Sequence, residues 1–259
     1  MKKIKFDKLI YGTGKSGMDL TQKIIKNNNL PVESRAVQIG VRFESPQKYF
    51  QKLIDISYDF KLYQKFDNVS IRSFCTNNSA AYVAVEETYG DISYNGHAKK
   101  GEEFRNDMTN FGILMEIKGI ENPFEWSREV VKKCQLHNTG LYYSPSRKPS
   151  ITSEGETVKS FHTDGNINLD FFKEAFGEYA DYILNFIDQM NKIFEFGDDF
   201  GIYIPEVKYL SPEPLVNYND LSLTNYNNVH FVGDALSARG ITVSGAHGIY
   251  VAESILKEN

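Results

Sequence analysis

Apolar positions change their spacing along the chain, and these changes predict alternating strands and helices. An apolar run over residues 5–11 predicts a strand, and apolar residues at helical spacing predict a helix over residues 18–27. From residue 36 to 44, apolar residues alternate with polar or small ones, which is typical of a strand with one face in water. A short helix is predicted to begin at Pro46.

Strand patterns dominate the middle of the chain and helical patterns follow them. Turn signals such as Asn95-Gly96 separate strands predicted at residues 60–63, 69–75, 81–86, 92–94 and 111–117. Helices are predicted at residues 122–137, 168–176 and 178–196, the first with Asn122 as its N-cap and Pro123 at its first position. Residues 201–210 are a predicted strand, and residues 138–165 and 211–228 are predicted loops.

This order of elements predicts a mixed α/β (α+β) fold with a discontinuous domain. Residues 1–36 and 205–259 are expected to form one layered α/β unit, and residues 37–204 an inserted, β-rich domain. Ligands commonly bind where two domains meet, so we expect a site there.

Composition argues against several classes of function. The 259 residues carry a formal net charge of −5 with both signs interspersed, which disfavours nucleic acid or an anionic membrane as the main partner. No apolar run approaches the length of a membrane span, and the basic N-terminus lacks the apolar stretch of a signal peptide. Two cysteines do not make a disulfide scaffold, so we expect a cytoplasmic protein.

The most informative segment lies near the C-terminus. A short apolar run over residues 229–232 ends in Gly233-Asp234, and a small-residue loop leads to a helix that begins near Ile241. A carboxylate at a strand end can accept hydrogen bonds from hydroxyl groups, and the first N–H groups of a helix attract anions. The helix start lacks bulk, so a flat ligand could approach its backbone; the small residues there are Gly240, Gly245, Ala246 and Gly248.

Near the N-terminus, Gly12-x-Gly14-x-x-Gly17 has dinucleotide-binding spacing between a predicted strand and a predicted helix. One interpretation is a complete NAD(P)-binding fingerprint in which Glu33 binds a ribose. Others are a glycine turn at which the chain returns to a flavin-binding domain, and a plain tight turn. A phosphate-binding P-loop is rejected because Leu9 stands where its first glycine is required.

These residues resemble FAD-dependent oxidoreductases of the glutathione-reductase type, and more closely a poorly characterised family of bacterial FAD-dependent dehydrogenases. The resemblance implies that Asp234 binds the ribityl–diphosphate part of FAD and that the helix start from Gly240 to Ala246 faces the flavin. It makes residues 10–17 the return turn. Further segments follow in the family's order, at residues 37–44, 73–75, 94–97, 109–110 and 202–208.

The chain departs from this family in two ways. Asn77-Asn78-Ser79 replace a second cysteine and a Pro-Gly pair, and the segment that binds ADP is absent before residue 5. We therefore expect a truncated or split flavoprotein, with a second chain supplying the ADP-binding half and the inserted domain forming a pocket for an unidentified small-molecule substrate. An NAD(P)-binding enzyme and a non-catalytic binding module are the alternatives.

No catalytic residue can be named from the sequence, and no metal site is expected because the five histidines lack ligand spacing. Buried filler is favoured over a reactive thiol for Cys75, and Cys134 is expected in the core. A strand-end salt bridge is favoured for Glu206, and His230 is expected to be structural. Weaker candidates are His247 beside a flavin, Arg239 as an anion ligand, and His162 with Asp164 in acid–base chemistry.

Overall fold

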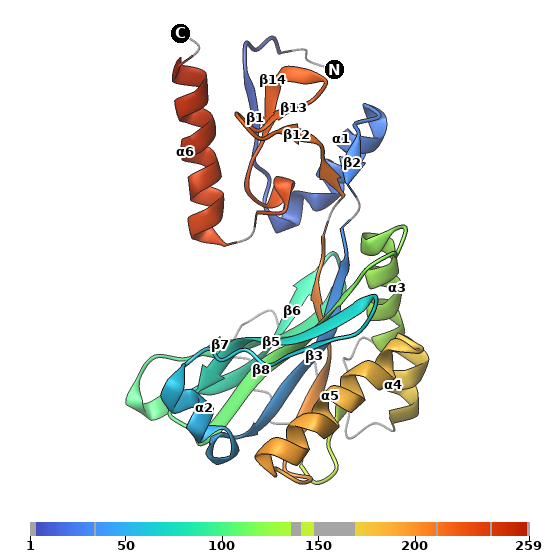
Figure 1. Cartoon of the computed structure of the whole chain (residues 1–259), viewed down its shortest axis with the longest axis vertical. Helices are drawn as coiled ribbons and strands as arrows, with labels where there is room; N and C mark the ends of the chain where they lie inside the picture. The colour runs from blue at the N-terminus through green and yellow to red at the C-terminus, as the bar shows by residue number, and fades with distance from the viewer. Residues whose placement is uncertain are drawn as a thin grey trace. The chain divides into compact units, whose positions relative to one another are not determined.

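The computed structural model describes residues 4–33, 35–135, 141–147, 169–210, 212–238 and 240–257. The chain is a mixed α/β protein (Figure 1) and divides into two compact units. The terminal unit comprises Met1–Arg35, Glu121–Phe124 and Tyr209–Asn259, and the central unit comprises Ala36–Ile120 and Glu125–Lys208. The roles expected for the two domains, cofactor binding and substrate binding, stay predictions.

A six-stranded sheet forms the framework of the central unit, and all of its neighbouring strands run antiparallel. Its order is β4 (Tyr63–Lys65), β5 (Val69–Asn78), β8 (Met108–Ile117), β3 (Val37–Pro46), β10 (Gly201–Lys208) and β9 (Leu141–Tyr143). The unit also contains α2 (Gln51–Ile56), α3 (Pro123–Cys134), α4 (Leu169–Phe176) and α5 (Tyr179–Phe194). Figure 1 shows the last three beside the sheet.

Both faces of the central sheet are covered. Side chains at odd positions of β3, such as Phe43, pack into an aromatic core with Phe50, Phe111, Phe196 and Phe200. The opposite face is covered by a hairpin of β6 (Ala81–Thr88) and β7 (Asp91–Ala98), because β7 contacts β3, β5, β8 and β10.

This double cover overturns the expectation that β3 is half exposed. Arg42 has 0% and Glu44 3% of its surface exposed, although both occupy the polar positions of the alternating pattern. Alternation identifies the two faces of a strand correctly. It cannot tell whether a distant segment covers the polar face.

The terminal unit contains a small mixed sheet in the order β1 (Leu9–Tyr11), β14 (Tyr226–Phe231), β13 (Ser222–Leu223) and β12 (Val216–Asn217). Among the pairs of this sheet, β1 and β14 run parallel, and the others run antiparallel. A separate antiparallel pair joins β2 (Val32–Glu33) to β11 (Glu213–Pro214). Helix α1 (Met18–Asn27) packs on the sheet through Ile25, which shares a core with Phe231 and Leu236.

The predicted elements are confirmed in places and wrong in others. Helix α1 has the predicted bounds, and α4 and α5 begin within a residue of theirs. The predicted loop at 211–228 is wrong because it contains β11, β12 and β13, and the predicted loop at 138–165 contains β9. These strands have two or three residues, which is too short for a pattern of alternation to be recognised.

The C-terminal helix α6 (Ile241–Lys257) has an unusual surface. Val251 is its buried residue, whereas Ile241, Ile249 and Leu256 are 95%, 65% and 73% exposed. In the described parts of the chain, no helix combines the length and the apolar character that crossing a membrane requires.

Phe43→Ala should lower the free energy of unfolding by about 3–5 kcal/mol, since Phe43 is fully buried and stacks on Phe111 at 5.0 Å between ring centroids. Chemical denaturation of both proteins measures the loss. Tyr63→Ala is the matched control, because Tyr63 is 62% exposed on the edge strand β4, and it should cost less than about 1 kcal/mol. Equal losses in the two variants would contradict this account of the core.

Candidate functional site

The parallel pair in the terminal unit brings two glycine turns together. Tyr11 pairs with Phe231, so β1 and β14 end at the same edge of the sheet, and Val232 N–H donates to the Tyr11 carbonyl at 3.0 Å. The chain then forms a 3₁₀ turn after each strand, at Lys15–Gly17 and at Gly233–Leu236, and these turns contact each other. Gly12, Gly14, Gly233 and Asp234 therefore lie in one region, as expected for a shared site.

The start of α6 is attached to the second turn. Gly233 has a φ of +62°, and Ala238 N–H donates to its carbonyl at 3.0 Å. Ser244 in the first turn of α6 donates its hydroxyl to the Ala238 carbonyl at 2.8 Å. A Cβ added at Gly233 would lie 3.4 Å from Ser244 Oγ, so the turn and the helix are in close contact.

Open space surrounds several of the predicted ligand contacts. A Cβ added at Gly14, Gly240 or Gly245 would meet no atom within 4 Å, whereas at Gly12 it would lie 2.9 Å from Val232 Cγ2. The other two predicted contacts on α6, Ile241 and Ala246, are exposed.

Asp234 is the one carboxylate at the junction of the second turn and α6 in the described residues. It is partly exposed, and within the described chain its side chain makes no hydrogen bond. An unpaired carboxylate at a strand end can accept hydrogen bonds from the hydroxyl groups of a ligand.

The complete NAD(P) fingerprint does not match the terminal unit. That motif requires a second strand that joins the first strand in one parallel sheet. Instead, β2 pairs antiparallel with β11, with Glu33 opposite Glu213. The glycine spacing is present, but the described residues do not form the βαβ unit in which this spacing binds a dinucleotide.

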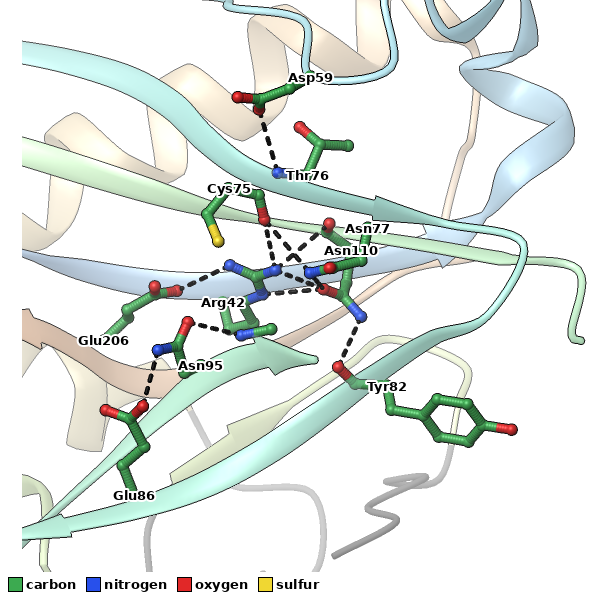
Figure 2. Close-up of polar contacts among 11 residues, drawn as sticks. Arg42, Asp59, Cys75, Thr76, Asn77, Tyr82, Glu86, Asn95, Asn110 and Glu206 are labelled. Atoms are coloured by element: carbon green, nitrogen blue, oxygen red, sulfur yellow. Dashed lines mark hydrogen bonds and ion pairs between the residues drawn. The ribbon is translucent and has the colours of Figure 1, made fainter. Parts of the chain in front are cut away.

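A second candidate lies inside the central unit, around Arg42 (Figure 2). Arg42 Nε donates to Asn110 Oδ1 at 3.0 Å, Nη2 donates to the Cys75 carbonyl at 2.7 Å, and Nη1 lies 3.5 Å from Glu206 Oε2. Asn77 Nδ2 donates to the same Asn110 oxygen at 3.1 Å. A fully buried guanidinium thus has partners from three other strands.

Two register shifts turn Asn77 and Glu206 toward Arg42. The register of β5 shifts between Phe74 and Asn77, and that of β10 shifts between Tyr203 and Glu206. Each shift puts residues three apart on the same face, although regular alternation would put them on opposite faces. Asn77 and Glu206 consequently face Arg42.

Two glycines make room for this cluster. A Cβ at Gly96 in the overlying strand β7 would overlap Arg42 Nη2, and a Cβ at Gly112 would lie 2.8 Å from Glu206 Oε2. The backbone of Gly96 is oriented by Asn95, whose Oδ1 accepts its N–H at 2.8 Å. Arg42 and its partners Cys75, Asn110 and Glu206 lie in four of the segments that resemble the flavoprotein family, and Gly96 lies in a fifth.

Glu206 is the titratable group of this cluster whose pKa lies near neutral pH. Burial raises its pKa to about 7, although Arg42 and Lys208 act in the opposite direction. Such a carboxyl can hold or release a proton at neutral pH, which is what general acid–base chemistry needs. Lys208 Nζ lies 3.8 Å from the centroid of the Phe74 ring.

The remaining predicted residues have mixed outcomes. Cys75 is exposed with a φ of +52°, so its expected role as buried filler is wrong, whereas Cys134 is fully buried as predicted. The predicted salt bridge of Glu206 exists, but it is buried inside the sheet. His230 is buried, with Nδ1 3.0 Å from the Asp220 carbonyl, and His247 lies partly exposed on α6. Outside the described residues lie His162, Asp164 and Arg239.

The sequence did not predict that Arg42, Asn77 and Asn110 form a cluster, although a salt bridge was expected for Glu206. The sequence features that marked this cluster were a charged residue in each of two strands, an asparagine in a third strand, and glycines in strands that face them. In the described residues, no group of three or more histidine, cysteine or carboxylate side chains could hold a metal ion.

Comparison of the chain with protein-family models and with curated protein sequences found no significant match. Functional conclusions therefore depend on the geometry and chemistry of the two sites.

Arg42→Met should lower the free energy of unfolding by about 3–5 kcal/mol, because it removes the counterion of Glu206 and the donors to Asn110 and Cys75. Urea denaturation tests this. Arg72→Met is the control on strand β5 of the same sheet, where the exposed side chain should contribute within about 0.5 kcal/mol. A loss no larger than that of the control would show that the cluster does not organise the sheet.

Stability should also depend on pH through Glu206. Its pKa in the folded protein, about 7, lies above the ordinary value of 4.5, so the folded state binds the proton more tightly. The stabilising contribution is complete below the ordinary pKa and is lost as the pH rises through 7. Denaturation between pH 5 and 8 should show this decline, and Glu206→Gln should abolish it; an unchanged decline in the variant would refute the assignment.

Proposed function

We propose that this chain belongs to an FAD-dependent oxidoreductase, with a partial Rossmann-like FAD-binding fold in the terminal unit. Gly233, Asp234 and the start of α6 would bind the flavin and ribityl part of FAD. The observation that carries this proposal is the meeting of both glycine turns with the first turn of α6 at the ends of the parallel strands β1 and β14.

The chemistry of this region suits a flat polyol ligand. The Asp234 carboxylate can accept hydrogen bonds from ribityl hydroxyl groups, and the N–H groups of the first turn of α6 favour negative charge. The open surface at Gly14, Gly240 and Gly245 lets a ring system approach the backbone. When bound, the flavin itself supplies hydride or electron transfer, and the protein binds and orients it.

A second polypeptide supplying the ADP-binding half is part of this proposal. Within the described residues β1 pairs with β14 alone, and Leu9 and Ile10 of β1 are 38% and 49% exposed. Parallel strands are normally buried in the interior of a covered sheet. The unpaired edge of β1 and the apolar surface of α6 support a further strand and helix there.

Asp234→Ala should weaken FAD binding roughly tenfold to one hundredfold, the effect of losing hydrogen bonds to a charged group. Quenching of flavin fluorescence during titration of the purified protein measures the affinity. Glu253→Ala is the matched control, because Glu253 is an exposed carboxylate farther along α6. Riboflavin should displace FAD from this chain, whereas ADP should not.

Other outcomes separate the competing functions. NAD(P) binding that is lost in Gly14→Asp and unaffected in Asp234→Ala would favour the dinucleotide interpretation of the first glycine turn. A folded, colourless protein that ignores both FAD and riboflavin would favour a non-catalytic binding module.

A further inference from the structure

A groove in the central unit is separate from both sites described above. Its volume is about 510 Å³, within the range of about 300–1,000 Å³ that small-molecule pockets occupy. Its walls come from the end of β3 with the turn into α2, from the end of β5, and from the segment before β8. The groove contains no residue of the Arg42 cluster.

Hydrogen bonds hold one wall of this groove in place. Ser79 donates its hydroxyl to Gln47 Oε1 at 2.9 Å, and Gln47 Nε2 donates to Gln51 Oε1 at 3.0 Å. Gln51 Nε2 in turn donates to Asp55 Oδ1 at 2.7 Å. Because these side chains are already ordered, a ligand would bind with little cost of reorganisation.

The opposite wall is held in the same way. Asn106 Nδ2 donates to the Ala81 carbonyl at 2.9 Å, and its Oδ1 accepts the N–H groups of Ala81 and Met108. Arg105 Nε and Nη2 donate to the Glu102 carboxylate at 2.8 and 3.1 Å, which orients the guanidinium plane.

The charges of the lining favour an anion. Lys48 and Arg105 contribute positive charges from two sides, and Asp107 is the one carboxylate among the lining residues. Lys48 Nζ lies 4.7 Å from the centroid of the Tyr49 ring, so the ammonium group makes a cation–π contact beside the groove. The neutral part of the lining consists mainly of amide and hydroxyl groups, so a complementary ligand carries hydrogen-bonding groups as well as an anionic head.

We propose that this groove binds a small organic anion, whose carboxylate or phosphate group pairs with Lys48 and Arg105. Its hydroxyl or amino groups would face Gln47, Ser79 and Asp107. This proposal does not depend on flavin binding, since every residue it uses lies in the central unit.

Isothermal titration of the whole protein at low ionic strength tests the proposal with three probes: citrate, glycerol 3-phosphate and uncharged glycerol. At least one anion should bind at one site per chain, and glycerol should not bind. Binding of citrate alone identifies a carboxylate site, binding of glycerol 3-phosphate alone identifies a phosphate site, and binding of both supports their shared chemistry.

Substitutions of lining residues test whether the anion binds in this groove. Lys48→Gln with Arg105→Gln should weaken binding roughly tenfold to one hundredfold, whereas Lys52→Gln should not, because Lys52 is an exposed lysine of α2 outside the groove. Failure of both anions to bind, retained affinity in the double variant, or an equal loss in Lys52→Gln would overturn the proposal.

Discussion

Arg42 has no exposed side-chain surface, so its positive charge must be matched by partners inside the protein. Those partners are the Glu206 carboxylate, the Asn110 side chain and the Cys75 carbonyl, which lie on three different strands. All three strands must reach one register before the charge is satisfied. The cluster thereby couples β3 to β5, β8 and β10, and the hairpin that covers it must pass with Gly96 directly above the guanidinium.

The terminal unit depends on a different constraint, the parallel pairing of β1 with β14. Parallel neighbours cannot be joined by a tight turn, and here the whole central unit intervenes in sequence between them. Since both strands end at one edge, their two glycine turns and the start of α6 become neighbours. A strand at the opposite edge of β1 would complete a sheet of the kind that binds nucleotides.

Local signals predicted part of this structure well. Helical spacing predicted α1, α4 and α5, and Asn122-Pro123 predicted the start of α3, because helices depend on contacts within a few residues. The terminal turn with Asp234 was also recognisable, since its glycines and its carboxylate are adjacent in sequence. Its role in binding FAD stays a prediction. The exposure of Cys75 and the burial of Arg42 were beyond these signals, because each depends on strands that are distant in the chain.

The sequence by itself determined which face of a strand is apolar, most of the helices, the mixed α/β class and the chemical groups that are present. Only the tertiary structure decided which polar groups meet. The register shifts in β5 and β10 turn Asn77 and Glu206 toward Arg42, and the β6–β7 hairpin removes water from around them. The physical reason is that alternation along a strand specifies which side a residue faces. What covers that side, and with which charge, is decided by segments many residues away.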